Sequence, residues 1–158
     1  MTQDTDIKFM QQAIALASQS VDQGGGPFGA VIVKNNIVIG SGHNRVTLDN
    51  DPTAHAEVNA IRHACKTIND FNLSGCTLYA SCEPCPMCMS SIYWARIERV
   101  VYAATGKDAS AAGFDDTFIS QEICKPYNQR SLSIEHLKCD EHNECFRKWV
   151  AKDDRTDY

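Results

Sequence analysis

The chain has 158 residues, of which 43% are apolar and 22% charged, and this length and composition predict one globular domain. No apolar run approaches the roughly 18 residues of a membrane span, which argues against a membrane protein. The formal net charge of −5 argues against a polynucleotide ligand, because affinity for nucleic acid depends largely on basic residues that neutralise phosphates.

The cysteine content bears on the cellular compartment. Residues 1–10 are acidic and polar and lack the basic and apolar segments of a signal peptide, so we expect a cytoplasmic protein. In that reducing compartment the eight cysteines are expected to be thiols or metal ligands rather than disulfides. The domain prediction is a single unit over residues 1–158.

The first part of the chain predicts a helix and a hairpin. Apolar residues recur at three- and four-residue steps from Ile7 through Ile14 to Val21, which indicates an amphipathic helix. The runs AVIVK (30–34) and IVIGS (37–41) are rich in β-branched residues and are predicted to be strands. The asparagine pair 35–36 between them tolerates the positive φ of a tight hairpin turn.

Helices and strands alternate in the rest of the chain. The run DPT (51–53) contains start signals for a second helix, which we expect to begin near Thr53 or Ala54. The further predicted elements are a strand at 76–81, a helix at 86–97, a strand at 99–105, a short helix at 116–124, a strand at 131–137 and a helix at 141–152. This order predicts an α/β fold, a three-layer α-β-α sandwich around a mixed five-stranded sheet.

One histidine and two cysteines have the character of a catalytic zinc site. Cys85 and Cys88 are three residues apart at the start of a predicted helix, so their side chains share a face. A helix N-terminus favours thiolates, and His55 stands at the start of the preceding predicted helix. Three such ligands plus one water is the usual catalytic arrangement, and we predict one Zn²⁺ per chain.

Glu57 is the candidate proton carrier of this site. It lies in the same helical turn as His55, which makes it a poor fourth ligand. Zinc lowers the pKa of a bound water from about 15.7 to about 7, and we expect Glu57 to take up the proton and pass it to a leaving amine. His-x-Glu followed by Pro-Cys-x-x-Cys is the signature of zinc deaminases.

Two other interpretations of these cysteines stay open. Cys82 could complete a structural zinc site with four protein ligands, and a lone Cys-x-x-Cys could be a redox pair. We place Cys82 at the exit of a strand, outside the metal site. The other cysteines are expected to be ordinary buried or half-exposed thiols: Cys65, Cys76, Cys124, Cys139 and Cys145.

The segments GGPFGAVIVK, NDPTAHAEV, SCEPCPMC, IYWARI and AGFDDTFI together resemble the small zinc-dependent guanine deaminases of bacteria, within the cytidine-deaminase-like superfamily. The similarity runs from about Phe9 to Glu122, returns at the terminal tyrosine and is weakest over 124–157. It implies hydrolytic deamination of guanine to xanthine and ammonia, as a step of purine metabolism, with a nucleobase as the substrate.

The resemblance also implies substrate contacts, namely Phe28, Asn44, Ala56, Trp94, Asp115 or Asp116, and Tyr158. The asparagine is expected to hydrogen-bond the base, the two aromatic residues to line the pocket and the Ala56 backbone to contact the base. Of the two aspartates Asp116 is expected near the substrate amine, with Asp115 as a near-equal alternative. The family forms homodimers in which a C-terminal segment, here about 139–158, crosses to the partner, so that Tyr158 would cap the partner's site.

Other functions remain compatible with the sequence. The substrate could be guanosine, adenine or cytosine, and a plant-type guanosine deaminase resembles the chain in the same segments. A tRNA adenosine deaminase shares HAE and PCxMC, although the net charge speaks against it. In a zinc-stabilised interaction module without enzymatic activity, Glu57 would be only a surface charge.

Overall fold

The computed structural model describes residues 3–158. The chain forms two compact units, and the boundary between them along the sequence lies between Ser120 and Gln121. The elements of the first unit are α1 (Gln3–Asp22), β1 (Gly29–Lys34), β2 (Ile37–His43), α2 (Val46–Asp49), α3 (Ala56–Ile68), β3 (Thr77–Cys82), α4 (Pro86–Trp94), β4 (Arg99–Ala104) and α5 (Gly106–Ala111). Within residues 3–158, no helix combines the length and apolarity that crossing a membrane requires.

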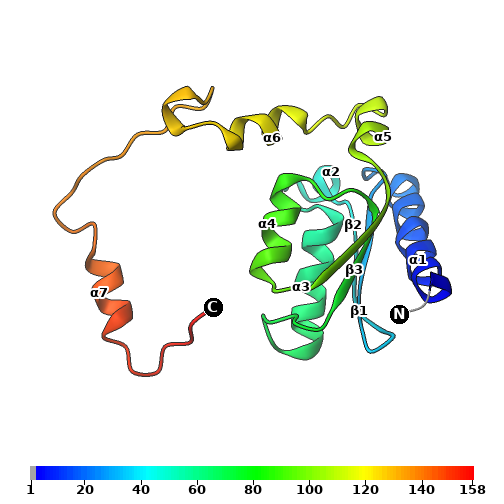
Figure 1. Cartoon of the computed structure of the whole chain (residues 1–158), viewed down its shortest axis with the longest axis horizontal. Coiled ribbons are helices and arrows are strands. Elements are labelled where there is room, and N and C mark those ends of the chain that lie inside the picture. The colour runs from blue at the N-terminus through cyan, green and yellow to red at the C-terminus, as the bar shows by residue number, and fades with distance from the viewer. Residues whose placement is uncertain (1–2) are drawn as a thin grey trace. The chain divides into compact units, whose positions relative to one another are not determined.

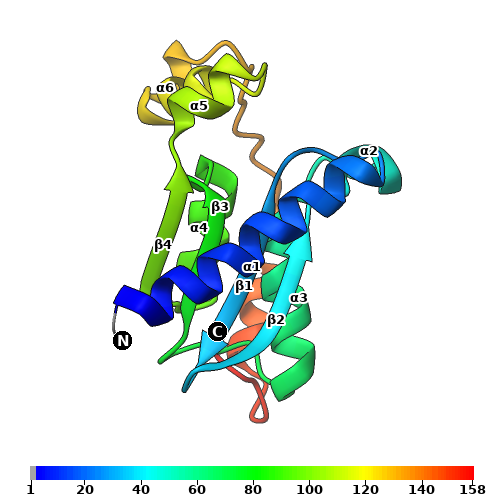
Figure 2. The ribbon, with the colours of Figure 1, turned by 90° about the vertical axis from the view of Figure 1, so that its right-hand side faces the viewer.

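The strands form one mixed sheet in the order β2-β1-β3-β4 (Figure 2). β1 is antiparallel to both β2 and β3, whereas β3 and β4 are parallel. The α/β fold with a mixed sheet is therefore confirmed, but the sheet of the described chain has four strands and not the predicted five. The expected fifth strand at 131–137 is irregular, with Leu132 and Leu137 69% and 85% exposed, so it has neither a paired edge nor a buried face.

Helices cover both faces of this sheet, α1 on one face and α3 with α4 on the other (Figures 1 and 2). Side chains alternate between the faces along each strand, as the pleat requires. Ile32 and Leu78 pack in the cluster that contains the α3 alanines, whereas Val31, Val33 and Tyr79 pack in the cluster with Phe9 of α1. Two apolar cores thus hold the three layers together.

Strand β2 and helix α3 pack in close contact, and α3 begins later than the sequence predicts. A Cβ atom on Gly42 would lie 2.4 Å from the carbonyl oxygen of Ala56, so only glycine lets the first turn of α3 approach the strand this closely. α3 begins at Ala56 rather than at the predicted Thr53 or Ala54. The reason is local, because Asp51 accepts hydrogen bonds from the backbone and hydroxyl of Thr53 and closes a turn there.

Other sequence predictions have mixed outcomes. The hairpin turn is confirmed, since Asn35 and Asn36 both have positive φ. α1 is present, and its buried face follows the expected stripe in part: Ala17 is buried, but Ile7 and Ile14 are about half exposed. Phe9 and Ala13 complete the buried face. The short helices α2 and α5 were not anticipated.

The second unit contains little regular structure. α6 (Thr117–Cys124) begins in the first unit, and η1 (Tyr127–Gln129) and α7 (Glu144–Val150) follow, the latter shorter than the predicted helix at 141–152. Glu122 is the one buried side chain of residues 121–158, where it accepts hydrogen bonds from the backbone and hydroxyl of Ser131 and pairs with Lys125. Large apolar side chains are instead exposed: Ile123, Tyr127, Leu132, Ile134, Leu137, Phe146, Trp149, Val150 and Tyr158.

Candidate metal centre and adjoining cleft

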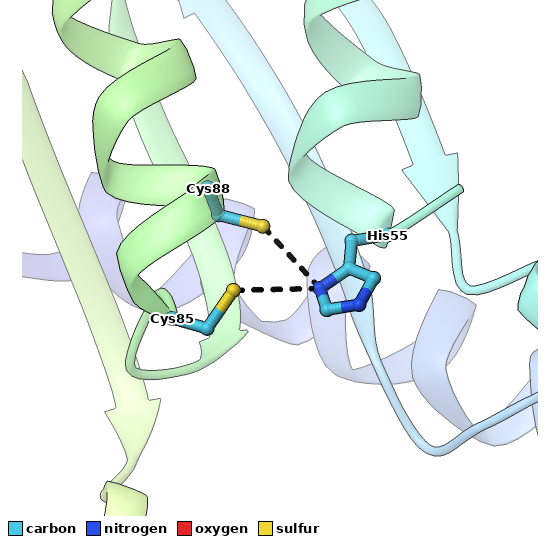
Figure 3. A group of neighbouring side chains, drawn as sticks. All are labelled: His55, Cys85 and Cys88. Atoms are coloured by element: carbon cyan, nitrogen blue, oxygen red, sulfur yellow. Dashed lines mark hydrogen bonds between the residues drawn. The ribbon is translucent and has the colours of Figure 1, made fainter. Parts of the chain in front are cut away.

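Two helix N-termini bring a histidine and two cysteines together. His55 is the N-cap residue of α3 and Cys85 that of α4, with Cys88 one turn further on. The Nδ1 atom of His55 lies 3.5 Å from the sulfur of each cysteine, and all three ligand atoms lie within 4.8 Å of one another (Figure 3). The structure therefore assembles the three residues that the sequence singled out.

These distances fit a zinc ion. With Zn–S near 2.3 Å and Zn–N near 2.0 Å, a tetrahedral angle separates nitrogen from sulfur by about 3.5 Å, which is the spacing found here. No fourth histidine, cysteine or acidic side chain of the described residues joins the group. Cys82 instead points its sulfur at the carbonyl oxygen of Thr105, 3.6 Å away. The donor set leaves a fourth position for a water or a substrate atom.

The two sulfurs are electrostatically coupled. The pKa of the Cys85 thiol is lowered to about 4, mainly because Cys88 donates a hydrogen bond to it and His55 lies beside it. The pKa of Cys88 is raised, because Cys88 is that donor and because it is buried. A divalent cation that binds both sulfurs takes them as thiolates, so metal binding releases any thiol proton that remains. All eight cysteines, which lie within residues 3–158, are free thiols.

Glu57 is a buried carboxyl group next to this cluster. Its side chain is 7% exposed, and its Oε2 atom lies 3.4 Å from the sulfur of Cys88. Burial raises the pKa of the Glu57 carboxyl, because the anion loses the solvation that water provides. A carboxyl group with a raised pKa beside a metal site is suited to accept and return a proton near neutral pH.

A cleft of about 480 Å³ opens from this cluster. His55, Glu57 and Cys85 lie on its floor side, and its other walls contain four of the expected substrate contacts, Phe28, Asn44, Asp115 and Asp116. The volume is within the usual range for small-molecule sites and is larger than a purine base needs. Residues from five segments of the first unit therefore converge on one cavity.

Asn44 is held in one orientation by the backbone around it. Its Oδ1 atom accepts hydrogen bonds from the backbone N–H groups of Gly26, at 3.3 Å, and Val46, at 3.2 Å. Because both partners are donors, they require the oxygen at this position and turn the Nδ2 amide elsewhere. The side chain is 6% exposed and lines the cleft, so it can offer an oriented N–H donor to a ligand.

The two neighbouring aspartates have different surroundings. Hydrogen bonds from the side chain and then the backbone N–H of Thr117 lower the pKa of the Asp115 carboxyl. The backbone bond, at 2.9 Å, holds this carboxyl at the start of α6. Asp116 is half-buried, and its negative charge is one of the influences that raise the pKa of His55, after the hydrogen bond with Cys85. Asp116 is therefore the aspartate with an electrostatic link to the metal cluster.

Three expected contacts do not line the cleft within the described residues. Ala56 is buried against β2, and Trp94, at the end of α4, is 65% exposed beside Tyr93 and Arg96 in a separate shallow hollow. Tyr158 belongs to the second unit, where its ring contacts that of Trp149 edge to face at 6.5 Å. Their roles in binding stay predictions.

The cleft also includes residues that the sequence did not single out. Phe114 packs edge to face on Phe28, with ring centroids 5.0 Å apart, and Glu83 and Thr47 lie on the walls. The signals for Phe114 and Glu83 were their positions inside the AGFDD and CEPC motifs. No pattern in the sequence pointed to Thr47, which donates its hydroxyl to the carbonyl oxygen of Gly24 at 2.9 Å.

Residues 3–104 match the family described as cytidine and deoxycytidylate deaminase zinc-binding region. The chain belongs to this family. It is 50% identical to the guanine deaminase of Bacillus subtilis over 151 residues, which cover 95% of this chain and 97% of that protein. The crystal structure of a guanine deaminase from Bacillus subtilis superimposes with a TM-score of 0.94 at 48% identity, covering 100% of this chain and 99% of that one.

More distant deaminases match only part of the chain. A guanine deaminase from Nitrosomonas europaea has a TM-score of 0.66 at 31% identity and covers 68% of this chain and 63% of that one. The tRNA-specific adenosine deaminase of Buchnera aphidicola is 46% identical over 105 residues, which cover 66% of this chain and 65% of that protein. Membership of the zinc-binding deaminase family and the three-ligand cluster together identify zinc as the cofactor.

Proposed function

We propose that this protein hydrolyses guanine to xanthine and ammonia. The observation that carries the proposal is the extent of the similarity to the Bacillus subtilis guanine deaminase, which includes the segment after β4 that forms one wall of the cleft. The tRNA-specific relative matches only about two thirds of the chain, so it supports the shared zinc chemistry rather than its own substrate. The net charge of −5 also disfavours tRNA.

The reaction replaces the C2–N bond of guanine with a C2–O bond. When bound by His55, Cys85 and Cys88, zinc supplies a Lewis acid that lowers the pKa of a water molecule. Glu57 takes up the proton of this water through its buried carboxyl group. The same carboxyl returns this proton to the ring nitrogen, then takes the proton of the hydroxyl newly attached to C2 and passes it to the amine, so that the C2–N bond breaks and ammonia leaves.

Three other groups of the cleft hold the base in place. Asn44 donates a hydrogen bond from Nδ2, since its Oδ1 is occupied by backbone donors. Phe28 covers a face of the base, supported from the side by Phe114. Asp116 accepts a hydrogen bond from an N–H group of the base, whereas the Asp115 carboxylate is already occupied by Thr117.

The functional form is a homodimer in which residues 139–158 cross to the partner and Tyr158 caps its site. The exposed apolar side chains of residues 121–158 support this proposal, because so many of them on one short segment are typical of an interface. The exposure of Trp94 supports a second contact surface. The enzyme acts in the cytoplasm as part of purine metabolism.

An assay of ammonia release tests the substrate. Guanine, guanosine, adenine and cytosine are compared on one zinc-loaded sample, with the zinc content measured on the same sample. Guanine is expected to be turned over fastest. Faster turnover of guanosine would identify a nucleoside deaminase, and a folded, zinc-loaded sample that leaves guanine intact would refute the proposal.

A further inference from the structure

Two glutamates form hydrogen bonds between the segments that flank the parallel strands β3 and β4, one at each end of the pair. Before the strands, Glu98 accepts a hydrogen bond from the backbone N–H of Gly75 at 3.0 Å. After them, Glu83 accepts one from the backbone N–H of Gly106 at 2.9 Å. Both glutamates are exposed, and each bonds a glycine 23 residues away in the sequence. The two contacts are chemically alike, but only Glu83 and Gly106 line the cleft.

The Glu83 contact joins the metal-binding loop to α5. Glu83 lies between β3 and Cys85, and its own backbone N–H donates to the carbonyl oxygen of Ala104 at 2.8 Å, which extends the strand pairing into the loop. Gly106 is the first residue of α5, and an N–H group in the first turn of a helix has no partner inside the helix. Thr105 and Asp108 cap the same turn reciprocally, so the carboxylate of Glu83 completes the end of this helix.

α5 leads directly into a part of the cleft lining that contains Phe114 and Asp116. The helix ends at Ala111, Gly113 turns the chain with φ of 92°, and Phe114 bonds back to the carbonyl oxygen of Ala109 at 3.0 Å. Phe114 then packs on Phe28 and Asp116 follows it. A shift of α5 at its first turn therefore moves the aromatic and acidic groups of this wall relative to the metal cluster.

We propose that Glu83 is a positioning residue, which sets the wall formed by Phe114 and Asp116 against the metal-binding loop through its hydrogen bond to Gly106. The kinetic part of this inference rests on the proposed function. Glu83 itself touches no reacting atom in this account. Its effect is on substrate binding, because the groups that it places hold the base while the metal ligands and Glu57 are placed by other elements.

The test compares Glu83→Ala with Glu83→Gln and with the matched control Glu98→Ala. The KM for guanine is expected to rise about tenfold in Glu83→Ala, which is the size of effect that loss of one charge-assisted hydrogen bond produces. The fall in kcat is expected to be smaller, and the zinc content per chain is expected to stay the same. Glu83→Gln keeps an oxygen acceptor and is expected to stay within about threefold of the wild type. Glu98→Ala is expected to leave KM unchanged.

Amide hydrogen exchange of residues 105–116 supplies a second readout that needs no substrate. Exchange there is expected to accelerate in Glu83→Ala and to stay at the wild-type rate in Glu98→Ala. Equal kinetics in the two alanine variants, loss of zinc from Glu83→Ala, or a glutamine variant as impaired as the alanine variant would overturn the proposal. If the wild type itself leaves guanine intact, the proposed function fails, and the exchange rates alone then decide the role of Glu83.

Discussion

The two units of the chain differ in how they are stabilised. The unit that ends at Ser120 contains two apolar clusters on the faces of a sheet, and the metal cluster and the cleft lie within it. The unit from Gln121 to Tyr158 buries one side chain, Glu122, and exposes most of its large apolar residues. A segment of fewer than about 40 residues rarely builds a sufficient core by itself and usually needs another stabilising contact. The first unit thus contains the metal cluster and the cleft, and the exposed apolar side chains of the second suit the proposed interface.

The largest expected effect comes from the buried carboxyl of the first unit. Glu57→Gln keeps the shape of the side chain but removes the group that moves the proton, so kcat is expected to fall about 10²- to 10⁴-fold. Ammonia release and zinc content measured on the same sample check this. Turnover that survives with zinc and fold intact would mean that Glu57 does not carry the proton and that another group does.

A smaller effect is expected where the first unit contacts the base. Asp116→Asn is expected to lower kcat/KM about 10- to 100-fold, because a hydrogen bond from the base to a charged acceptor is weakened. The matched variant Asp115→Asn keeps an oxygen that accepts from the backbone N–H of Thr117 and is expected to change kcat/KM by less than about threefold. Reversed sizes of the two effects would assign the base contact to Asp115.

Loss of the aromatic contact from the second unit is expected to raise the KM for guanine about tenfold. Tyr158→Ala removes one aromatic contact from the proposed partner site, so KM for guanine is expected to rise by about that factor. Tyr127→Ala, which removes another exposed tyrosine of the same unit, serves as the control. Sedimentation velocity is expected to show a dimer for both variants. A monomeric wild type, or equal KM values in the two variants, would contradict a role of this unit at the site.

The smallest expected effect concerns stability without any change in catalysis. Asp6 of α1 accepts hydrogen bonds from Arg99 at 2.7 and 2.8 Å and from the hydroxyl of Tyr79 at 2.6 Å. These bonds, led by that of Arg99, hold the pKa of the Asp6 carboxyl well below its usual range. Asp6→Asn is expected to lower the free energy of unfolding by about 1–2 kcal/mol and to leave KM unchanged.

The pH dependence of this contribution has a defined sign. Because folding lowers the pKa of Asp6, its stabilisation is fully present above the unfolded pKa of about 3.9 and is lost as the pH falls towards the folded pKa. Urea unfolding at pH 7 and at pH 3 is therefore expected to show a smaller difference between Asp6→Asn and the wild type at the lower pH. A difference that grows at pH 3 would contradict this account.

Local sequence signals predicted the parts of the structure that local physics determines. The hairpin followed from the tolerance of Asn35 and Asn36 for positive φ, and the metal cluster followed from the spacing of Cys85 and Cys88. The α3 start was misplaced because the carboxylate of Asp51 closes its own turn instead of capping the helix. A helix start signal and a turn signal use the same residue types, so their sequence patterns overlap.

Features that depend on contacts between residues far apart in the chain were harder to predict from the sequence. The buried face of α1 depends on which side chains fit against the sheet, and the close approach of Leu16 and Ala17 to Gly29 selects Ala13 and Ala17 rather than the larger Ile14. The fifth strand was expected at 131–137 (SLSIEHL), but a strand also needs a paired neighbour. Nothing in the sequence indicated the role of Glu83 beyond its place in the CEPC motif, because its hydrogen-bond partner Gly106 lies 23 residues away.

The most direct test of the central claim is a zinc titration of metal-free protein with xanthine formation as the readout. We expect no turnover of guanine without zinc and a rate that rises in proportion to bound zinc. The rate should level off at about one ion per chain, when every site formed by the three ligands is occupied. Full turnover by the metal-free protein, or none by protein that holds one zinc ion per chain, would contradict the account.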